Sequence, residues 1–259
     1  MKSPFSVTHI INSCTLLQFG EDAILTDPYF VDHWYWKWSE PIGMKVSQLP
    51  KLSAIIGGHS VFDHWQISSL DEYEYKDETP VFVATKSMAR KARVVGFKQV
   101  EVLDWNESRY ISDHLKLEVV PAQHSAGLKV NNYVLSTEEL RVFYGSEALD
   151  LAPLQQYRNG ANSPVDVVLV PVNGARLLNL VKLVMNGKDA VEATRILGAK
   201  TLVAIHDSQL PVPILFGVPS STTKAEEAAR QLGDEIEVIR VKPGQLWEYR
   251  PQLGADTQH

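Results

Sequence analysis

Residues 52–64 read LSAIIGGHSVFDH, and this stretch decides the fold expected for the chain. The apolar run at 52–56 is typical of a buried strand, and the two glycines after it end the strand in a loop. His59, Asp63 and His64 then follow within six residues. A turn after a strand can aim several side chains into one crevice, and imidazole together with carboxylate suits zinc, iron or manganese. The alternative is a polar loop in which Asp63 caps a short helix.

Two further histidines stand at comparable places in the chain. His124 comes soon after a predicted strand at 115–120, and His206 directly follows one at 202–205. Either histidine alone fits a hydrogen-bonded structural role. The repetition of the arrangement favours a site that several strand ends share.

The rest of the chain alternates short β-like runs with amphipathic stretches, without a repeat or a linker. Two sheets enclosed by helices would account for this alternation, and we expect one domain over residues 1–259. Helices are predicted at 66–73, 87–95, 188–197 and 222–232, and residues 177–185 are interpreted as a buried helix. The predicted strands are 6–11, 15–19, 23–26, 52–56, 81–84, 100–103, 109–112, 115–120, 132–136, 141–144, 165–170, 202–205, 236–241 and 246–249.

Composition narrows the class of protein. The 259 residues are 44% hydrophobic and 22% charged, as in ordinary globular proteins. The net charge of −6 argues against a nucleic-acid binder. The single cysteine excludes an intrachain disulfide and fits a reducing compartment. No signal peptide and no membrane span are expected from the sequence, so the predicted location is the cytoplasm.

Taken in order, these motifs resemble the metallo-β-lactamase-fold superfamily. The resemblance is greatest to the branch that holds L-ascorbate-6-phosphate lactonase and the N-acyl-phosphatidylethanolamine-hydrolysing phospholipase D. It implies a four-layer αββα sandwich, an α/β fold. The matching stretches are TDP at 26–28, HSVFDH at 59–64, LDWNES at 103–108, PAQH at 121–124, the segment 185–191 and His206.

The chain departs from the ligand set of these families, so the resemblance implies a degenerate metal site. Val61 stands where the families have a second histidine, and Ser146 stands where they have a metal-bridging aspartate. Five of the seven usual ligand positions remain: His59, Asp63, His64, His124 and His206.

The surviving positions imply one divalent ion, zinc with manganese or iron as alternatives, held by Asp63, His64 and His206. The function so implied is hydrolysis of a small ester, lactone, amide or phosphoester by a metal-bound water, with His59, His124 and Asp63 in catalytic roles. The alternative is a protein without metal, which binds a small molecule or catalyses a non-hydrolytic step such as cyclisation. Replacement ligands from Glu147 or His33 stay open.

An aromatic run lies near the start of the chain. Residues 30–38 read FVDHWYWKW, of which five are aromatic. The run fits a wall for an apolar or ring-bearing small-molecule substrate, and it equally fits a packed lid or a contact in a homo-oligomer. Together with 177–185 it would suit a membrane surface, but the few basic residues beside the two segments argue against that role.

Overall fold

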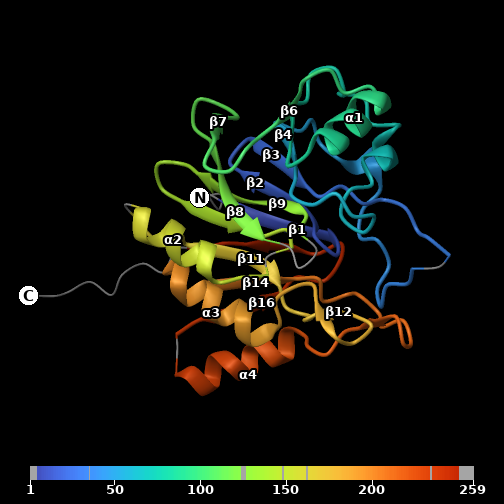
Figure 1. Cartoon of the computed structure of the whole chain (residues 1–259). Coiled ribbons are helices and arrows are strands. Elements are labelled where there is room, and N and C mark those ends of the chain that lie inside the picture. The colour runs from blue at the N-terminus through green and yellow to red at the C-terminus, as the bar shows by residue number, and fades with distance from the viewer. Residues whose placement is uncertain are drawn as a thin grey trace, which may run out of the picture.

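Two mixed sheets of seven strands each form the body of the protein (Figure 1). The computed structural model describes residues 5–34, 36–123, 127–147, 149–161, 163–233 and 235–250. In the first sheet, three antiparallel strands lead into a parallel run from β3 to β6. Its order is β17 (Leu246–Glu248), β1 (Phe5–Ile11), β2 (Cys14–Phe19), β3 (Asp22–Thr26), β4 (Ala54–Gly57), β5 (Val81–Val83) and β6 (Val100–Val102).

The second sheet has the same design. Strands β7 to β10 are antiparallel, and the strands from β10 to β16 are parallel. The carboxyl ends of parallel strands share one edge of a sheet, where crevices for ligands form. The order is β16 (Glu237–Arg240), β14 (Thr201–Ile205), β11 (Val167–Pro171), β10 (Arg141–Tyr144), β9 (Lys129–Ser136), β8 (Lys116–Gln123) and β7 (Ser108–Tyr110).

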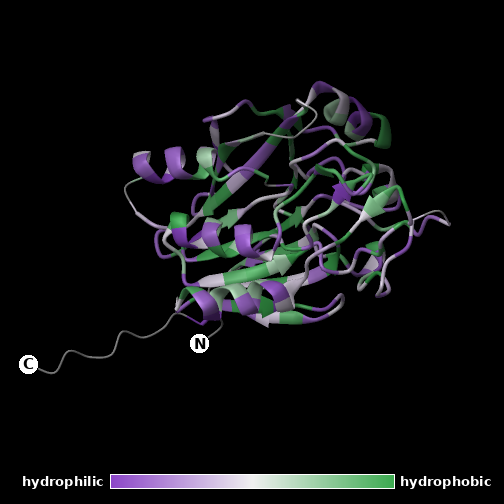
Figure 2. Ribbon diagram, turned by 60° about the horizontal axis from the view of Figure 1, so that its bottom comes forward, coloured by the Kyte–Doolittle hydropathy of each residue, from purple (hydrophilic) through white to green (hydrophobic). Residues whose placement is uncertain are grey.

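Helices cover the outer face of each sheet. On the first sheet lie α1 (Lys86–Val95) and the 3₁₀ turns Val46–Gln48 and Ile67–Leu70; on the second lie α2 (Ala152–Gly160), α3 (Gly187–Leu197) and α4 (Thr222–Leu232) (Figure 1). The ends of α1 and α3 follow local chemistry: Thr85 and Asn186 cap their first turns, and glycines with left-handed backbone end them. Figure 2 shows apolar residues along the strands and many polar residues on the helices.

Three layers of apolar side chains hold the sandwich together. One fills the space between the sheets and includes Leu17 and Tyr133. A second joins the first sheet to α1, and a third joins the second sheet to α2, α3 and α4. Because apolar layers lie on both faces of both sheets, the molecule is an αββα sandwich, which confirms the predicted fold class.

The interpretation of residues 177–185 as a buried helix is wrong. The segment is a hairpin of β12 (Arg176–Leu177) and β13 (Val181–Lys182), and β15 (Phe216–Gly217) pairs with β12 to make a third, small sheet. Leu178 and Asn179 take left-handed backbone, with φ of 50° and 58°, which reverses the chain and prevents a helix. In addition, residues 66–73 form only the 3₁₀ turn Ile67–Leu70, and α2 lies in a stretch for which no element was predicted.

Among the described residues, no helix is both long and apolar enough to cross a bilayer.

Candidate active site

The loop after β4 presses against the second sheet. A Cβ on Gly58 would lie 2.4 Å from the Cβ of Ser146 and 2.6 Å from the Asn131 carbonyl oxygen, so only glycine fits there. This close approach places His59 and His64 between the sheets, where both are fully buried. The two imidazole rings are 5.6 Å apart between centroids.

Asp27 is the buried carboxylate around which the site is built. It follows β3 with a left-handed φ of 35°. Its Oδ1 accepts the Gly58 N–H at 2.8 Å, and its Oδ2 accepts the Tyr144 hydroxyl at 2.9 Å and also the Ser146 hydroxyl. Its Oδ2 lies 2.9 Å from His64 Nδ1. Donors on every side therefore offset the desolvation of a fully buried charge.

His64 is held in one orientation by this carboxylate. Burial lowers the pKa of His64, but the hydrogen bond to Asp27 and the nearby charge of Asp63 outweigh it and raise the pKa to about 9. The surroundings thus favour positive charge at this point. The other ring nitrogen, Nε2, is buried and has no hydrogen-bond partner among the described residues.

His206 lies beside it. Its ring centroid is 4.8 Å from that of His64, and it follows β14 with a φ of 62°. Its Nε2 is 2.5 Å from the Ser13 hydroxyl, whereas its Nδ1 is buried without a hydrogen-bond partner in the described part of the chain. Burial, and then the neighbouring histidines, hold the pKa of His206 well below its usual range, so this ring is neutral.

His59 is paired with a carboxylate. Its Nε2 lies 3.0 Å from Glu147 Oε2, and both side chains are buried. The Val61 N–H donates to His59 Nδ1 at 3.2 Å, so the ring proton belongs on Nε2, the nitrogen that lies beside Glu147. Glu147 had been considered as a replacement ligand, and here it is the partner of His59.

Asp63 is held by residues that follow strands of both sheets. Its Oδ2 accepts from Gln209 Nε2 at 3.1 Å, and Gln209 accepts in turn from Asn173 at 2.7 Å. The Asn12 side chain donates to the Asp63 carbonyl oxygen at 3.0 Å. The Asp63 carboxylate therefore faces an amide.

The structure brings together most of the side chains that the sequence singled out. The gathered residues are His59, His64 and His206, with Asp63 at the edge, whereas His124 lies outside the described residues. His33 packs edge-on against Tyr29 in the aromatic run, at 6.0 Å between centroids. Sequence reasoning missed the roles of Asp27, Ser13, Tyr144 and Gln209; only the first had a signal, as the centre of the TDP stretch.

The side chains gathered at the site can be compared with what a metal ion requires as ligands. Within the described residues, no three His, Cys, Asp or Glu side chains are arranged to hold an ion. Two buried imidazole nitrogens, Nε2 of His64 and Nδ1 of His206, nevertheless lack partners, and buried polar atoms are rarely left so. Imidazole nitrogens of this kind are common ligands of divalent ions, and the carboxylate of Asp63 is next to His64 in sequence.

Comparison with known proteins places the chain in a family. Residues 22–206 match the model of the beta-lactamase superfamily domain. The chain belongs to the metallo-β-lactamase superfamily. This confirms the family that the motifs had indicated.

Two curated relatives of this superfamily member are named "UPF0173 metal-dependent hydrolase". The one from Rubrobacter xylanophilus is 22% identical over 87% of this chain and 88% of its own length. The one from Thermococcus onnurineus is 26% identical over 52% of this chain, and the match spans only 56% of that relative. A "possible metal-dependent hydrolase" from Veillonella parvula has the same fold, with a TM-score of 0.78 at 14% identity over 94% of this chain and 99% of that one.

Proposed function

We propose that this protein is a metal-dependent hydrolase of a small ester, lactone, amide or phosphoester, working with one divalent ion. Asp63, His64 and His206 would hold the ion, with zinc, manganese and iron all compatible with these ligands. The observation that carries the proposal is the pair of partnerless buried nitrogens on His64 and His206. The names of the relatives support the same reaction class.

The contacts of the remaining residues support one ion rather than two. Ser146 stands at the position of the missing aspartate and donates its hydroxyl to Asp27. His59 is held by Glu147, so its Nε2 is committed to a carboxylate instead of an ion. For Asp63 to become the third ligand, its carboxylate has to exchange the amide of Gln209 for the metal.

The chain's own residues have separate roles in this proposal. A bound divalent ion supplies Lewis acidity and lowers the pKa of water. Asp27 accepts from His64 Nδ1 and so keeps Nε2 directed into the site, where a bound ion would take the place of its proton, as carboxylates behind metal-binding histidines do. His59 and Glu147 lie in ion-pair contact, Nε2 to Oε2, and this pair could pass a proton to or from a substrate oxygen or nitrogen.

An aromatic path leads to the site. Trp36 contacts Phe62 edge-on at 4.9 Å and Phe216 at 5.1 Å, and Phe62 belongs to the loop that carries His59 and His64. Phe62 is partly exposed. We infer that this path receives an apolar or ring-bearing group of the substrate.

Metal content is the direct test. After loading with zinc and desalting, elemental analysis should find one ion per chain in the wild type and almost none in His206→Ala. His114→Ala, which removes an exposed histidine, is the matched control and should keep its ion. Two firmly held ions per chain, or full loading of His206→Ala, would refute the one-ion site.

Two observations support the alternative of a metal-free protein. The described residues contain no ready-made three-ligand group, and the His59–Glu147 pair closes part of the site without an ion. Assays of a panel of esters, lactones and phosphoesters, with and without chelator, distinguish a metal-dependent hydrolase from a metal-free protein. Turnover that survives complete metal removal would favour the alternative.

A further inference from the structure

The small third sheet exposes an unusual number of aliphatic side chains. Leu180 is 79% exposed and Ile214 is 85% exposed, and four neighbours are at least 40% exposed. We call this group the leucine tip; it consists of Leu177, Leu178, Leu180, Val181, Ile214 and Leu215. Exposed apolar groups that gather in one place mark interaction surfaces.

Backbone pairing fixes the leucine tip as one surface. Leu177 pairs with Phe216 across β12 and β15, and the Leu178 N–H donates to the Leu215 carbonyl at 2.8 Å. The tip residues come from segments about forty positions apart, so the sequence does not show them together. The sheet itself stays docked through Phe216, which is buried against Trp36 and Val184.

Strained backbone holds the tip outward. Leu178 and Ile214 have φ of 50° and 68°, in the left-handed region that bulky and β-branched residues avoid. Such conformations persist where a structure enforces them, and they cluster at functional surfaces. Both residues are therefore held in conformations that the surrounding structure enforces, and both are exposed.

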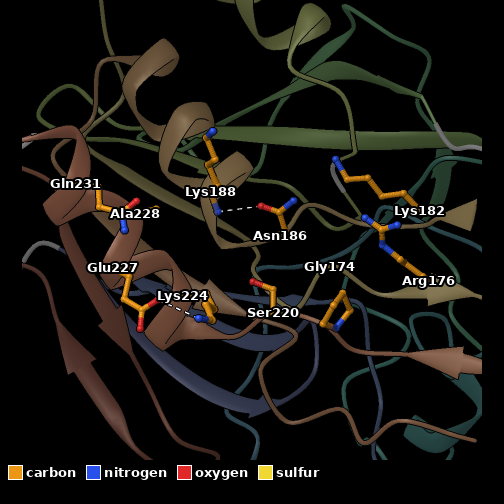
Figure 3. Close-up of a pocket in the computed structure, with 11 residues that line it drawn as sticks. Gly174, Arg176, Lys182, Asn186, Lys188, Ser220, Lys224, Glu227, Ala228 and Gln231 are labelled. Carbon is orange, nitrogen blue, oxygen red and sulfur yellow. Dashed lines mark hydrogen bonds and ion pairs between the residues drawn. The ribbon is translucent and has the colours of Figure 1, made fainter. Parts of the chain in front are cut away.

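A basic pocket adjoins the tip. A cavity of about 320 Å³ is lined by Arg176 and Lys182 from the hairpin, Lys188 from α3 and Lys224 from α4 (Figure 3). Two of the four charges have acidic partners: Lys182 lies 2.6 Å from Asp189, and Lys224 lies 3.0 Å from Glu227. The pocket is thus positive by about two charges in a protein whose net charge is −6.

Two of these cations are placed directly opposite one another. Arg176 and Lys182 are cross-strand partners in the hairpin, and like charges in that arrangement are unfavourable. Figure 3 shows Arg176 and Lys182 together on one side of the pocket, and Lys188 and Lys224 on the other side. Asp189 already offsets the charge of Lys182, so Arg176 and Lys188 are the pocket cations for which the described residues show no ion pair and which an anion would contact.

Aliphatic groups beside a cationic pocket match the surface of an anionic bilayer. We propose that the leucine tip and the basic pocket dock this protein reversibly on lipid that carries anionic headgroups. The aliphatic side chains enter the boundary between headgroups and acyl chains, and the pocket receives a headgroup phosphate. A two-fold contact between copies fits less well, because it would bring two positive pockets towards each other.

The sequence had argued against such a surface because few basic residues lie beside 177–185. The fold adds to these few residues, because α3 and α4 bring Lys188 and Lys224 to the hairpin. This inference does not depend on the proposed hydrolase activity, so each can fail alone.

Co-sedimentation of the full chain with vesicles tests the proposal. Vesicles of phosphatidylcholine with phosphatidylglycerol should bind the protein at low salt and release it at high salt, and pure phosphatidylcholine should bind it weakly. The triple variant Leu178→Ser/Leu180→Ser/Ile214→Ser should weaken binding to these vesicles by about tenfold or more, because it removes several CH₂ groups that would enter the bilayer. Lys188→Glu/Lys224→Glu should do the same through charge.

Helix α1 offers a matched control. It packs on β5 and β6, and it exposes Val94 (83%) near Lys91. Val94→Ser/Lys91→Glu should bind vesicles as the wild type does. Inorganic phosphate should compete only weakly with the vesicles for the protein. If phosphate at constant ionic strength releases all of the protein from the vesicles, the pocket binds a free anion and the docking proposal is overturned.

A second measurement guards against misfolded variants. The one native cysteine, Cys14, is buried, so an environment-sensitive fluorophore on Leu180→Cys reports the tip alone. Its emission should shift to the blue with anionic vesicles. Equal binding to both kinds of vesicle, or a dimer in light scattering that Ile214→Ser abolishes, would overturn the proposal.

Discussion

Asp27→Asn is the most informative single substitution, because it keeps the shape of the side chain and removes its charge. If the amide oxygen takes the Oδ2 position, it still accepts from Tyr144, Ser146 and His64, but the amide nitrogen then faces the Gly58 N–H. If the amide is reversed, its nitrogen faces the other donors. Either orientation leaves at least one buried donor without an acceptor.

The expected magnitude follows from these contacts. An unsatisfied buried N–H costs about 1–3 kcal/mol, and hydrogen bonds to a neutral acceptor are weaker than those to a carboxylate by about 1 kcal/mol. The desolvation of the charge is relieved in the variant, which offsets part of the loss. We expect a net destabilisation of about 2–4 kcal/mol and a fall in Tm of about 5–15 °C. Zinc affinity should fall by about 10–100-fold, because His64 loses the carboxylate behind it.

Urea unfolding in chelator gives the stability, and competition with a chromophoric chelator gives the zinc affinity. Asp166→Asn is the matched control: that half-buried carboxylate accepts the Arg141 N–H at 2.7 Å, so its loss should affect stability but leave zinc affinity unchanged. An Asp27→Asn protein that binds zinc as tightly as the wild type would refute the role given to Asp27.

Three further outcomes are expected. Ser146→Asp places a second carboxylate beside that of Asp27. The Tm of this variant should be lower than that of the wild type in chelator, and it should rise more when zinc is added. Equal responses of the two proteins in differential scanning fluorimetry would contradict this expectation. Gly58→Ala should lower the free energy of unfolding by about 1–3 kcal/mol through its clash with Ser146, whereas Gly160→Ala, with open space around it, should be neutral or stabilising. Glu147→Gln weakens the hold on the His59 proton and should lower kcat by about 10²-fold or more with little change in KM; unchanged steady-state kinetics would remove this pair from the mechanism.

The convergence of the histidines could be predicted because each follows a strand. His59, His64 and His206 come after β4 and β14, and the hydrophobic pattern of those strands is local. Each histidine follows the carboxyl end of a strand, where ligand sites form in parallel sheets, so this repeated placement already indicates a common site, although β4 and β14 belong to different sheets. The fold class followed from the same alternation of strands and helices.

The supporting contacts could not be predicted, because they join distant parts of the chain. The carboxylate of Asp27 meets donors from Tyr144 and Ser146, more than 100 positions later. Tyrosine and serine are too common to stand out without the coordinates. The hairpin at β12 and β13 was mistaken for a helix for a similar reason, since its partner β15 lies about forty residues away.

The site lies along the seam of the sandwich. Asp27 and His64 follow strands of one sheet, whereas Ser146 and His206 follow strands of the other. A ligand bound by residues of both sheets stabilises their packing, because separating the sheets would also require releasing the ligand. By mass action, occupancy would then slow proteolytic breakdown of the whole chain, and degradation of the protein would depend on the supply of the ion proposed for this site.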